Sequence, residues 1–185
     1  MLYTFPGPFV WWGKVERHQE IKKVLLPQID QLIKEIPEDL VVPHWNCTVH
    51  SSFGKGISFL RDPVLKKEIV WDPLDACLSE VTLTQRALTS RISEIWFNQY
   101  EANFFQEVHD HGGASFSGIY LLELNEANST AFFHQGQVSY LQGDFRTEEI
   151  TEGNVIIFPS CLPHYVNPTL KKRTTISFNV FTEFE

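Results

Sequence analysis

The chain has 185 residues, of which 43% are hydrophobic and 14% aromatic, and it carries a formal net charge of −8. This length is enough for one domain with a sizeable core but crowded for two, so we expect a single domain over residues 1–185. Because Lys and Arg occur only in short runs such as Lys171–Arg173, we expect no general binding to nucleic acid or to acidic membrane surfaces.

The cysteines and the N-terminus point to a reducing compartment. Cys47, Cys77 and Cys161 are widely spaced and form no Cys-x-x-Cys pair, so a disulfide framework is not indicated, and we expect Cys161 to be a buried thiol and not a zinc ligand. The apolar N-terminus has no basic leader, and no run of about 18 apolar residues occurs. We therefore expect a cytoplasmic protein without membrane insertion.

Residues 1–92 are expected to form helical and loop support. Apolar residues recur at three-and-four spacing over 21–36, which predicts a helix with one buried face that ends before Pro37. Pro27 lies inside it, and because a helix-interior proline costs about 3 kcal/mol, we expect a kink or two abutting helices. A second helix is predicted from about 77 to 90, and loops with short strands over 42–71.

Residues 93–185 show closely spaced strand signals separated by Gly, Pro and Asn. The predicted strands are 93–100, 115–124, 129–141, 145–150, 153–159, 164–167 and 173–184. Many short strands after a helical first half predict a mainly β fold, a β-sandwich or jelly roll buttressed by N-terminal helices.

The last predicted strand separates polar from apolar residues by strict alternation. One face is polar and would line a cavity, and the other is apolar and would pack beneath the helices. The polar face consists of Arg173, Thr175, Ser177 and Asn179, and the apolar face of Ile176, Phe178 and Val180.

Three histidines form the pattern of a mononuclear metal site. His109 and His111 are two apart, so on an extended strand both side chains point the same way, and His164 would arrive from a distant strand. Arg173 follows His164 at a distance that lets the chain turn and return as the next strand. A buried guanidinium requires an anion, and a carboxylate of a cosubstrate could supply it through two charge-assisted hydrogen bonds.

Four motifs follow one another in the second half of the chain: His-x-His, Ser-Gly-x-Tyr, Phe-Pro-Ser…His and Arg…Ser-Phe-Asn. They lie in SEIWFNQYEANFFQEVHDHGGASFSGIYLL, EGNVIIFPSCLPHYVNP and RTTISFN, with weaker likeness in HWNCTVHSSFG. In these motifs and their order the chain resembles the iron(II)- and 2-oxoglutarate-dependent oxygenases, specifically the small oxygenases common in cyanophages and marine bacteria.

The resemblance implies a double-stranded β-helix, the cupin-like barrel, with Fe(II) at its open end. By position, His109, His111 and His164 would be the metal ligands, and Arg173 would hold the distal carboxylate of 2-oxoglutarate, the cosubstrate. Such enzymes consume O₂, release succinate and CO₂, and usually hydroxylate a C–H bond, here of an unidentified peptide or small molecule. No catalytic residue is assigned beyond the ligands. Residues placed to contact the cosubstrate would be Asn98, Tyr100, Tyr120, Thr175 and Ser177.

One position departs from the wider superfamily, which uses two histidines and a carboxylate. His111 occupies the slot of the usual aspartate, and strand geometry would turn Asp110 away. A three-histidine site is the favoured interpretation, with a bulge that brings in Asp110 or Glu107 as the alternative. Three neutral imidazoles leave the ferrous site about one unit more positive and could admit Zn²⁺ or Ni²⁺.

Two functions of other classes remain open. A cupin-type three-histidine metal enzyme could work without 2-oxoglutarate, although Arg173 would then lack a role beyond pairing with an acidic residue. A noncatalytic, phage-associated module could keep the barrel for binding. Long edge strands would favour a homodimer.

Overall fold

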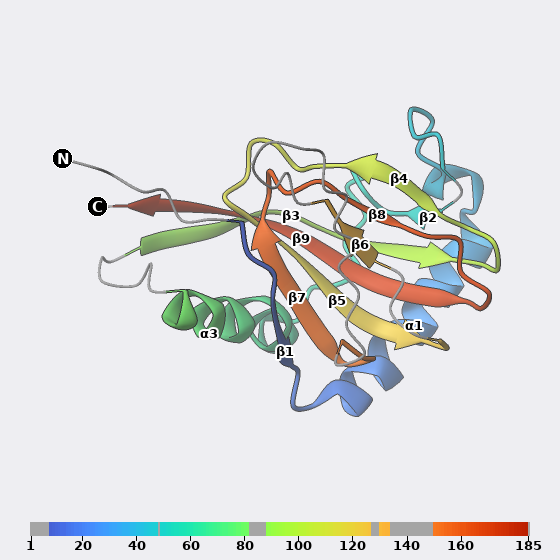
Figure 1. The fold of residues 1–185 in the computed structure, drawn as a ribbon. Helices are drawn as coiled ribbons and strands as arrows, with labels where there is room; N and C mark the ends of the chain where they lie inside the picture. Colours follow the sequence, from blue (N-terminus) through green and yellow to red (C-terminus); the bar gives the residue numbers. More distant parts are fainter. Residues whose placement is uncertain (1–7, 48, 82–87, 127–129, 134–149, 185) are drawn as a thin grey trace.

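The chain folds into two antiparallel β-sheets with helices on one side (Figure 1). The computed structural model describes residues 8–47, 49–81, 88–126, 130–133 and 150–184. In spatial order the larger sheet consists of β1 (Trp11–Lys14), β7 (Asn154–Pro159), β5 (Phe116–Leu124), β9 (Arg173–Phe184), β3 (Leu88–Tyr100) and β2 (His50–Ser51). The smaller sheet consists of β4 (Gln106–His109), β8 (His164–Val166) and β6 (Thr130–Phe132).

The helices precede the strands of the core, and they cover the outer face of the larger sheet (Figure 1). They are α1 (His18–Glu35), a 3₁₀ turn (Glu38–Leu40), α2 (Pro63–Lys66), a π-helical segment (Lys67–Trp71) and α3 (Asp72–Glu80). This arrangement confirms the mainly β fold with N-terminal helical support. Among the described residues, no helix combines the length and the apolar character that crossing a bilayer would require.

Strand β9 lies in the middle of the larger sheet, where it pairs with β3 and β5. Its apolar face packs in the core cluster that the helices share, as the alternation predicts. That cluster includes Ile21, Leu25 and Ile29 of α1, Leu74 and Cys77 of α3, and Ile176, Phe178 and Val180 of β9. At roughly 1.5–3 kcal/mol for each buried aliphatic or aromatic side chain, this layer is a major source of stability.

The space between the two sheets is filled by two smaller apolar clusters. One contains Ile119, Leu121, Phe132, Ile156 and Phe158, and the other contains Val49, Tyr100 and Val166. The cavity described below also lies between the sheets.

Several helix predictions need correction. The proposed helix over 77–90 ends with α3 at Glu80, and Leu88–Ser90 belongs to β3 because it pairs with the end of β9. Pro63–Trp71 is helical instead of looped, since the Asp62 carboxylate caps the Val64 N–H at 2.8 Å. Pro27 lies within one helix, so the alternative of two abutting helices is wrong.

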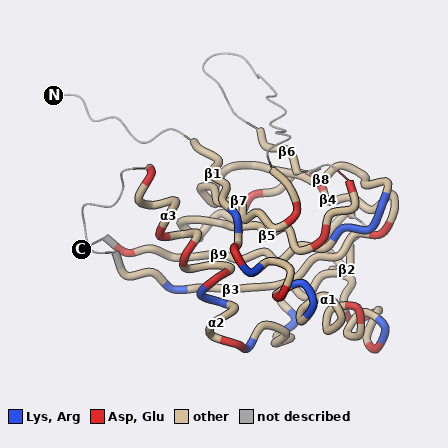
Figure 2. Tube along the Cα trace, turned by 90° about the horizontal axis from the view of Figure 1, so that it is seen from below, with Lys and Arg blue, Asp and Glu red and all other residues tan. Residues whose placement is uncertain are grey.

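The other strand predictions agree with β3, β5, β6, β7, β8 and β9, except that β3 starts earlier than expected. The predicted segments over 134–141 and 145–149 lie outside the described residues. Cys161 is exposed, so the buried thiol expected there is wrong, whereas Cys77 is buried. Lys and Arg residues alternate with Asp and Glu residues along several elements (Figure 2).

Glu152 connects helix α1 to the larger sheet through hydrogen bonds. The Glu152 carboxylate accepts from Lys22 Nζ at 2.8 Å and from the Leu124 backbone N–H at 2.8 Å, and His18 Nε2 lies 3.1 Å away. Gly153, with φ +89°, passes so close to the His18 ring that a Cβ would lie 2.9 Å from it. A side chain at position 153 would therefore disturb the packing of α1 against the sheet.

Glu152→Gln should destabilise the fold by about 1–2 kcal/mol at pH 7. Burial alone would raise the pKa of this carboxyl, but the hydrogen bonds from Lys22 and the Leu124 backbone, joined by His18, lower it below its ordinary value. A lowered folded-state pKa means that the charged form stabilises the fold above the unfolded-state pKa, and that this contribution disappears as pH falls through the folded-state value.

Urea unfolding from pH 7 to pH 3 measures this effect. The gap in unfolding free energy between wild type and Glu152→Gln should be constant near neutrality and shrink below the ordinary pKa of a glutamate. Glu80→Gln, at an exposed position, is the matched control. A gap that widened toward acid pH would contradict the assignment.

Candidate metal centre

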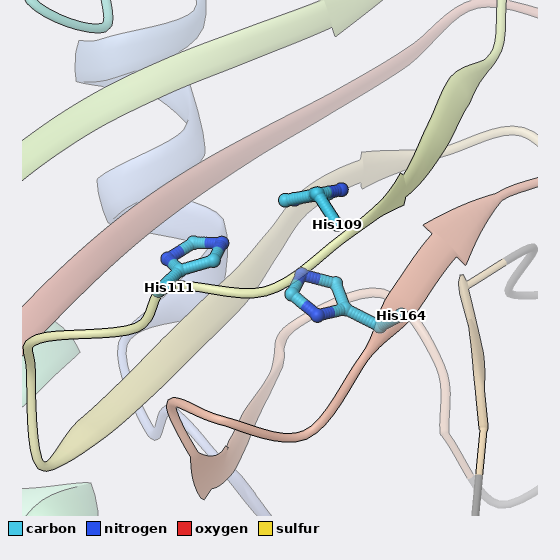
Figure 3. Close-up of side chains that lie close together, drawn as sticks. All are labelled: His109, His111 and His164. Atoms are coloured by element: carbon cyan, nitrogen blue, oxygen red, sulfur yellow. The ribbon is translucent and has the colours of Figure 1, made fainter.

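Two neighbouring strands of the smaller sheet, with the segment that follows the first of them, bring His109, His111 and His164 together (Figure 3). His109 ends β4 and is directly opposite His164, the first residue of β8. His111 follows β4, and its backbone N–H donates to the Ser160 carbonyl at 2.8 Å. The ring centroids of His109 and His164 are 4.3 Å apart, and His111 lies 5.2 Å and 5.1 Å from these two rings. One nitrogen from each ring lies within 4.8 Å of the others.

Each imidazole is oriented by an oxygen acceptor at its Nδ1. The acceptors are the Glu107 carbonyl for His109 (2.8 Å), Asn179 Oδ1 for His111 (2.7 Å) and the Leu162 carbonyl for His164 (3.1 Å). Because these oxygens can only accept, each Nδ1 carries the proton, and each Nε2 keeps its lone pair. Histidine ligands of metals are commonly held in this way.

The remaining nitrogens are suited to a cation. His111 Nε2 is buried without a hydrogen-bond partner. Burial lowers the pKa of His111 to about 4, and it also lowers those of His109 and His164, in the last case reinforced by its two neighbours. The rings are therefore neutral at pH 7, the form that ligates metals. Three neutral nitrogen donors fit a first-row divalent ion such as Fe(II).

Neither candidate carboxylate joins this group. Asp110 is exposed, and its Oδ1 accepts from the Gly112 N–H at 3.0 Å. Glu107 Oε1 accepts from the Asn46 N–H at 3.1 Å. Among the described residues, the only group of His, Cys, Asp and Glu side chains able to hold a metal is the set of three histidines. The geometry favours a three-histidine site over the bulge alternative.

Asn179 supports His111, a role that the sequence analysis did not assign. Its Oδ1 also accepts from Ser117 Oγ at 2.7 Å, and Ser117 Oγ lies 2.9 Å from Ser160 Oγ. The Trp96 ring lies 5.6 Å from that of His111. The available signal was the alternation of β9, which places Asn179 on the same face as Arg173.

Arg173 lies in the same interior, where it is only 2% exposed. Its Nη2 donates to Thr130 Oγ1 at 2.6 Å, and its guanidinium carbon lies 5.6 Å from the centre of the Tyr100 ring. Burial lowers the pKa of Arg173 to about 10, although Tyr100 and Glu126 act in the opposite direction. Arg173 therefore remains charged at neutral pH.

A cavity of about 530 Å³ includes the three histidines and Arg173 in its lining. This volume is in the usual range for small-molecule sites. Four further residues that the sequence placed near the cosubstrate line it as well: Asn98, Tyr100, Thr175 and Ser177. The Tyr100 hydroxyl donates to Gln106 Oε1 at 2.6 Å, and Gln106 Nε2 lies 3.4 Å from His109 Nε2.

Tyr120 lies on the other side of the sheet, which contradicts its sequence-based role. Its hydroxyl is 2.7 Å from His18 Nδ1, and its ring packs in the core shared with the helices. The neighbouring Ile119 lines the cavity. Because side chains alternate along β5, a residue next to one that faces the cavity must face the helices.

Comparison with solved structures reveals the same fold in oxygenases. A prolyl-4-hydroxylase from Pseudomonas putida superposes with a TM-score of 0.59 at 12% identity, covering 95% of this chain and 92% of its own. A Trichoplax adhaerens prolyl hydroxylase in complex with a peptide fragment of the hypoxia inducible factor oxygen degradation domain gives 0.53 at 14% identity, covering 93% and 83%. The viral collagen prolyl hydroxylase of Paramecium Bursaria Chlorella virus-1, a 2OG complex, gives 0.51 at 12% identity, covering 92% and 95%.

The double-stranded β-helix expected from the sequence is therefore confirmed. A search of curated proteins finds no match. Residues 94–179 match the family model described as "Putative 2OG-Fe(II) oxygenase", a stretch that includes all three histidines and Arg173. Together, this match and this fold indicate a 2-oxoglutarate-dependent oxygenase, a class of enzymes that use Fe(II) and 2-oxoglutarate.

Proposed function

We propose that this oxygenase hydroxylates a C–H bond of a peptide or small molecule at a three-histidine iron site. His109, His111 and His164 would hold Fe(II), and Arg173 would hold the distal carboxylate of 2-oxoglutarate. Bound together, Fe(II) and 2-oxoglutarate supply an O₂-dependent oxidation in which one oxygen atom enters the substrate and the other enters succinate, with loss of CO₂.

The observation that carries this proposal is the common orientation of the three rings. All three Nδ1–H groups are bound to oxygen acceptors, which leaves each Nε2 without a proton, and one nitrogen from each ring lies within 4.8 Å of the others. Side chains that served only as core histidines would have no need of this matched tautomer. An ion between them would also satisfy the buried Nε2 of His111.

Arg173 suits the dicarboxylate for electrostatic reasons. A guanidinium in a protein interior strongly favours a bound anion, and its planar fork can grip a carboxylate with two hydrogen bonds. Thr130 and Tyr100 limit its movement from two sides. Fixing that end orients the keto acid end toward the histidines, because both groups line one cavity.

Prolyl hydroxylases are among the similar folds, and one of them is in complex with a peptide fragment. At 12–14% identity these likenesses support a peptide substrate only by analogy. We keep as predictions the cytoplasmic location, the phage origin, the homodimer and the single domain over residues 1–185.

Metal binding should depend on the support that Asn179 gives to His111. Asn179→Ala removes the acceptor of the His111 Nδ1–H and should weaken Fe(II) binding by about 10–100-fold, whereas Asn179→Asp keeps an acceptor and should bind more tightly than the alanine variant. Anaerobic Fe(II) titration gives the affinities. Asn125→Ala, at an exposed asparagine, is the matched control, and equal affinity in the two alanine variants would contradict the ligand assignment.

Anaerobic Fe(II) protein mixed with 2-oxoglutarate should develop a weak visible metal-to-ligand charge-transfer band. In Arg173→Ala the concentration of 2-oxoglutarate that half-saturates the band should rise by about 100-fold or more, because two hydrogen bonds to charged groups are lost. Arg173→Lys keeps the positive charge but loses the planar pair of donors. Its half-saturating concentration of 2-oxoglutarate should lie between those of the wild type and Arg173→Ala.

Arg61→Ala is the control, since its exposed side chain is remote from the cavity lining. Circular dichroism shows whether each variant is folded. Iron binding without a band at saturating 2-oxoglutarate would favour the cupin-type enzyme. Absence of both iron binding and succinate formation would favour the noncatalytic module.

A further inference from the structure

A row of aromatic rings leads along the cavity to His111. The ring centroids of Trp45 and Phe53 are 5.5 Å apart, those of Phe53 and Trp96 are 5.0 Å apart, and those of Trp96 and His111 are 5.6 Å apart. Trp45 and Phe53 are half-buried, whereas Trp96 is only 3% exposed. All four residues line the cavity, so these three aromatic side chains, here called the aromatic row, form a wall next to the metal centre.

The aromatic row is held in place by carboxylates. Glu107 Oε1 accepts from the N–H of Asn46, the residue after Trp45, at 3.1 Å. Glu94 Oε1 accepts from the N–H of Gly54, the residue after Phe53, at 2.8 Å. These contacts fix the backbone at two rings before any ligand arrives. A preformed wall favours a specific ligand because little conformational entropy is lost on binding.

Charge is distributed unevenly in the cavity lining. Among the described residues that line it, Arg173 is the only Lys or Arg and is deeply buried, whereas Glu107 in β4 and Asp110 just after it reach solvent. In the proposed complex, the 2-oxoglutarate dianion offsets two of the three positive charges of Fe(II) and Arg173, and Glu107 and Asp110 bring the sum to −1. A second substrate that enters the cavity therefore contacts the aromatic row and two carboxylates.

We propose that the substrate carries a cationic nitrogen that sits against the aromatic row of Trp45, Phe53 and Trp96 beside Glu107 and Asp110. This inference rests on the proposed function and adds the chemical class of its substrate. Aromatic faces attract an ammonium group through their quadrupole, and nearby carboxylates strengthen the attraction. A neutral substrate would use the rings alone, and an anion would be repelled.

Choline and its uncharged isostere 3,3-dimethylbutan-1-ol test the proposal, since they differ in charge and hardly in shape. Anaerobic calorimetry on protein loaded with Fe(II) and 2-oxoglutarate measures the affinity of each probe. Choline should bind about tenfold more tightly or better. Trp45→Leu should reduce that preference to below about threefold, and Trp45→Phe should retain most of it.

The carboxylates are tested by variants that keep their hydrogen-bond acceptors. Glu107→Gln can still accept from the Asn46 N–H, and Asp110→Asn from the Gly112 N–H. Each should weaken choline binding by roughly threefold to tenfold and leave the isostere unaffected. Glu80→Gln removes the same charge at an exposed position outside the cavity lining and should change neither affinity.

A second pair of probes separates the two sources of such a cation. Glycine pentapeptides with a central lysine or norleucine present a basic side chain and its neutral counterpart. A preference for lysine supports a peptide substrate, and a preference for choline alone supports a small quaternary amine. Equal binding within both pairs, while the charge-transfer band is present, overturns the cationic substrate and leaves the proposed function standing. Absence of the band overturns the proposed function itself.

Discussion

The alternation of side chains along β9 is the constraint on which both the core and the cavity depend. This strand lies between β3 and β5 in the larger sheet, so neither of its faces can turn without breaking two ladders of hydrogen bonds. One face gives the helices Ile176 and Phe178, and the other gives the cavity Arg173 and Asn179. Arg173, the proposed anion-binding group, and Asn179, which supports the proposed metal ligand His111, are therefore fixed by the same register.

Three imidazoles in place of two and a carboxylate change the electrostatics of the centre. The three proposed ligands would supply no negative charge to the ion, so a bound dianion would provide most of the neutralisation. One molecule of 2-oxoglutarate would thus neutralise positive charge at both ends of the cavity. Its keto acid end would lie at the metal, and its distal carboxylate at Arg173. The orienting acceptors are carbonyl and amide oxygens, which fix the rings without adding charge.

The sequence predicted features that follow a strict period and missed those that depend on distant partners. Alternation and spacing were enough for the faces of β9 and for the approach of His109, His111 and His164. Tyr120 was misassigned because the Ser-Gly-x-Tyr motif places it in β5 but does not show which face of the sheet its side chain occupies. The pairing of β5 decides that face. The helix expected over 77–90 failed at Leu88–Ser90, where pairing with β9 overrides local propensity. Trp45 and Phe53 could be named from the sequence as aromatic residues of a substrate loop, but their alignment with Trp96 could not be predicted, since the rings come from separate loops and β3.

Glu107 links the metal centre to the aromatic row through two different oxygens. Its backbone carbonyl accepts from His109 Nδ1 at 2.8 Å, and its carboxylate accepts from the Asn46 N–H beside Trp45. The orientation of His109, a proposed metal ligand, and the position of the aromatic row thus both depend on Glu107, which lies at the edge of the smaller sheet. The register shift between Gln106 and His109 allows this, because an irregular strand can direct a carbonyl inward to a ring and a side chain toward a loop.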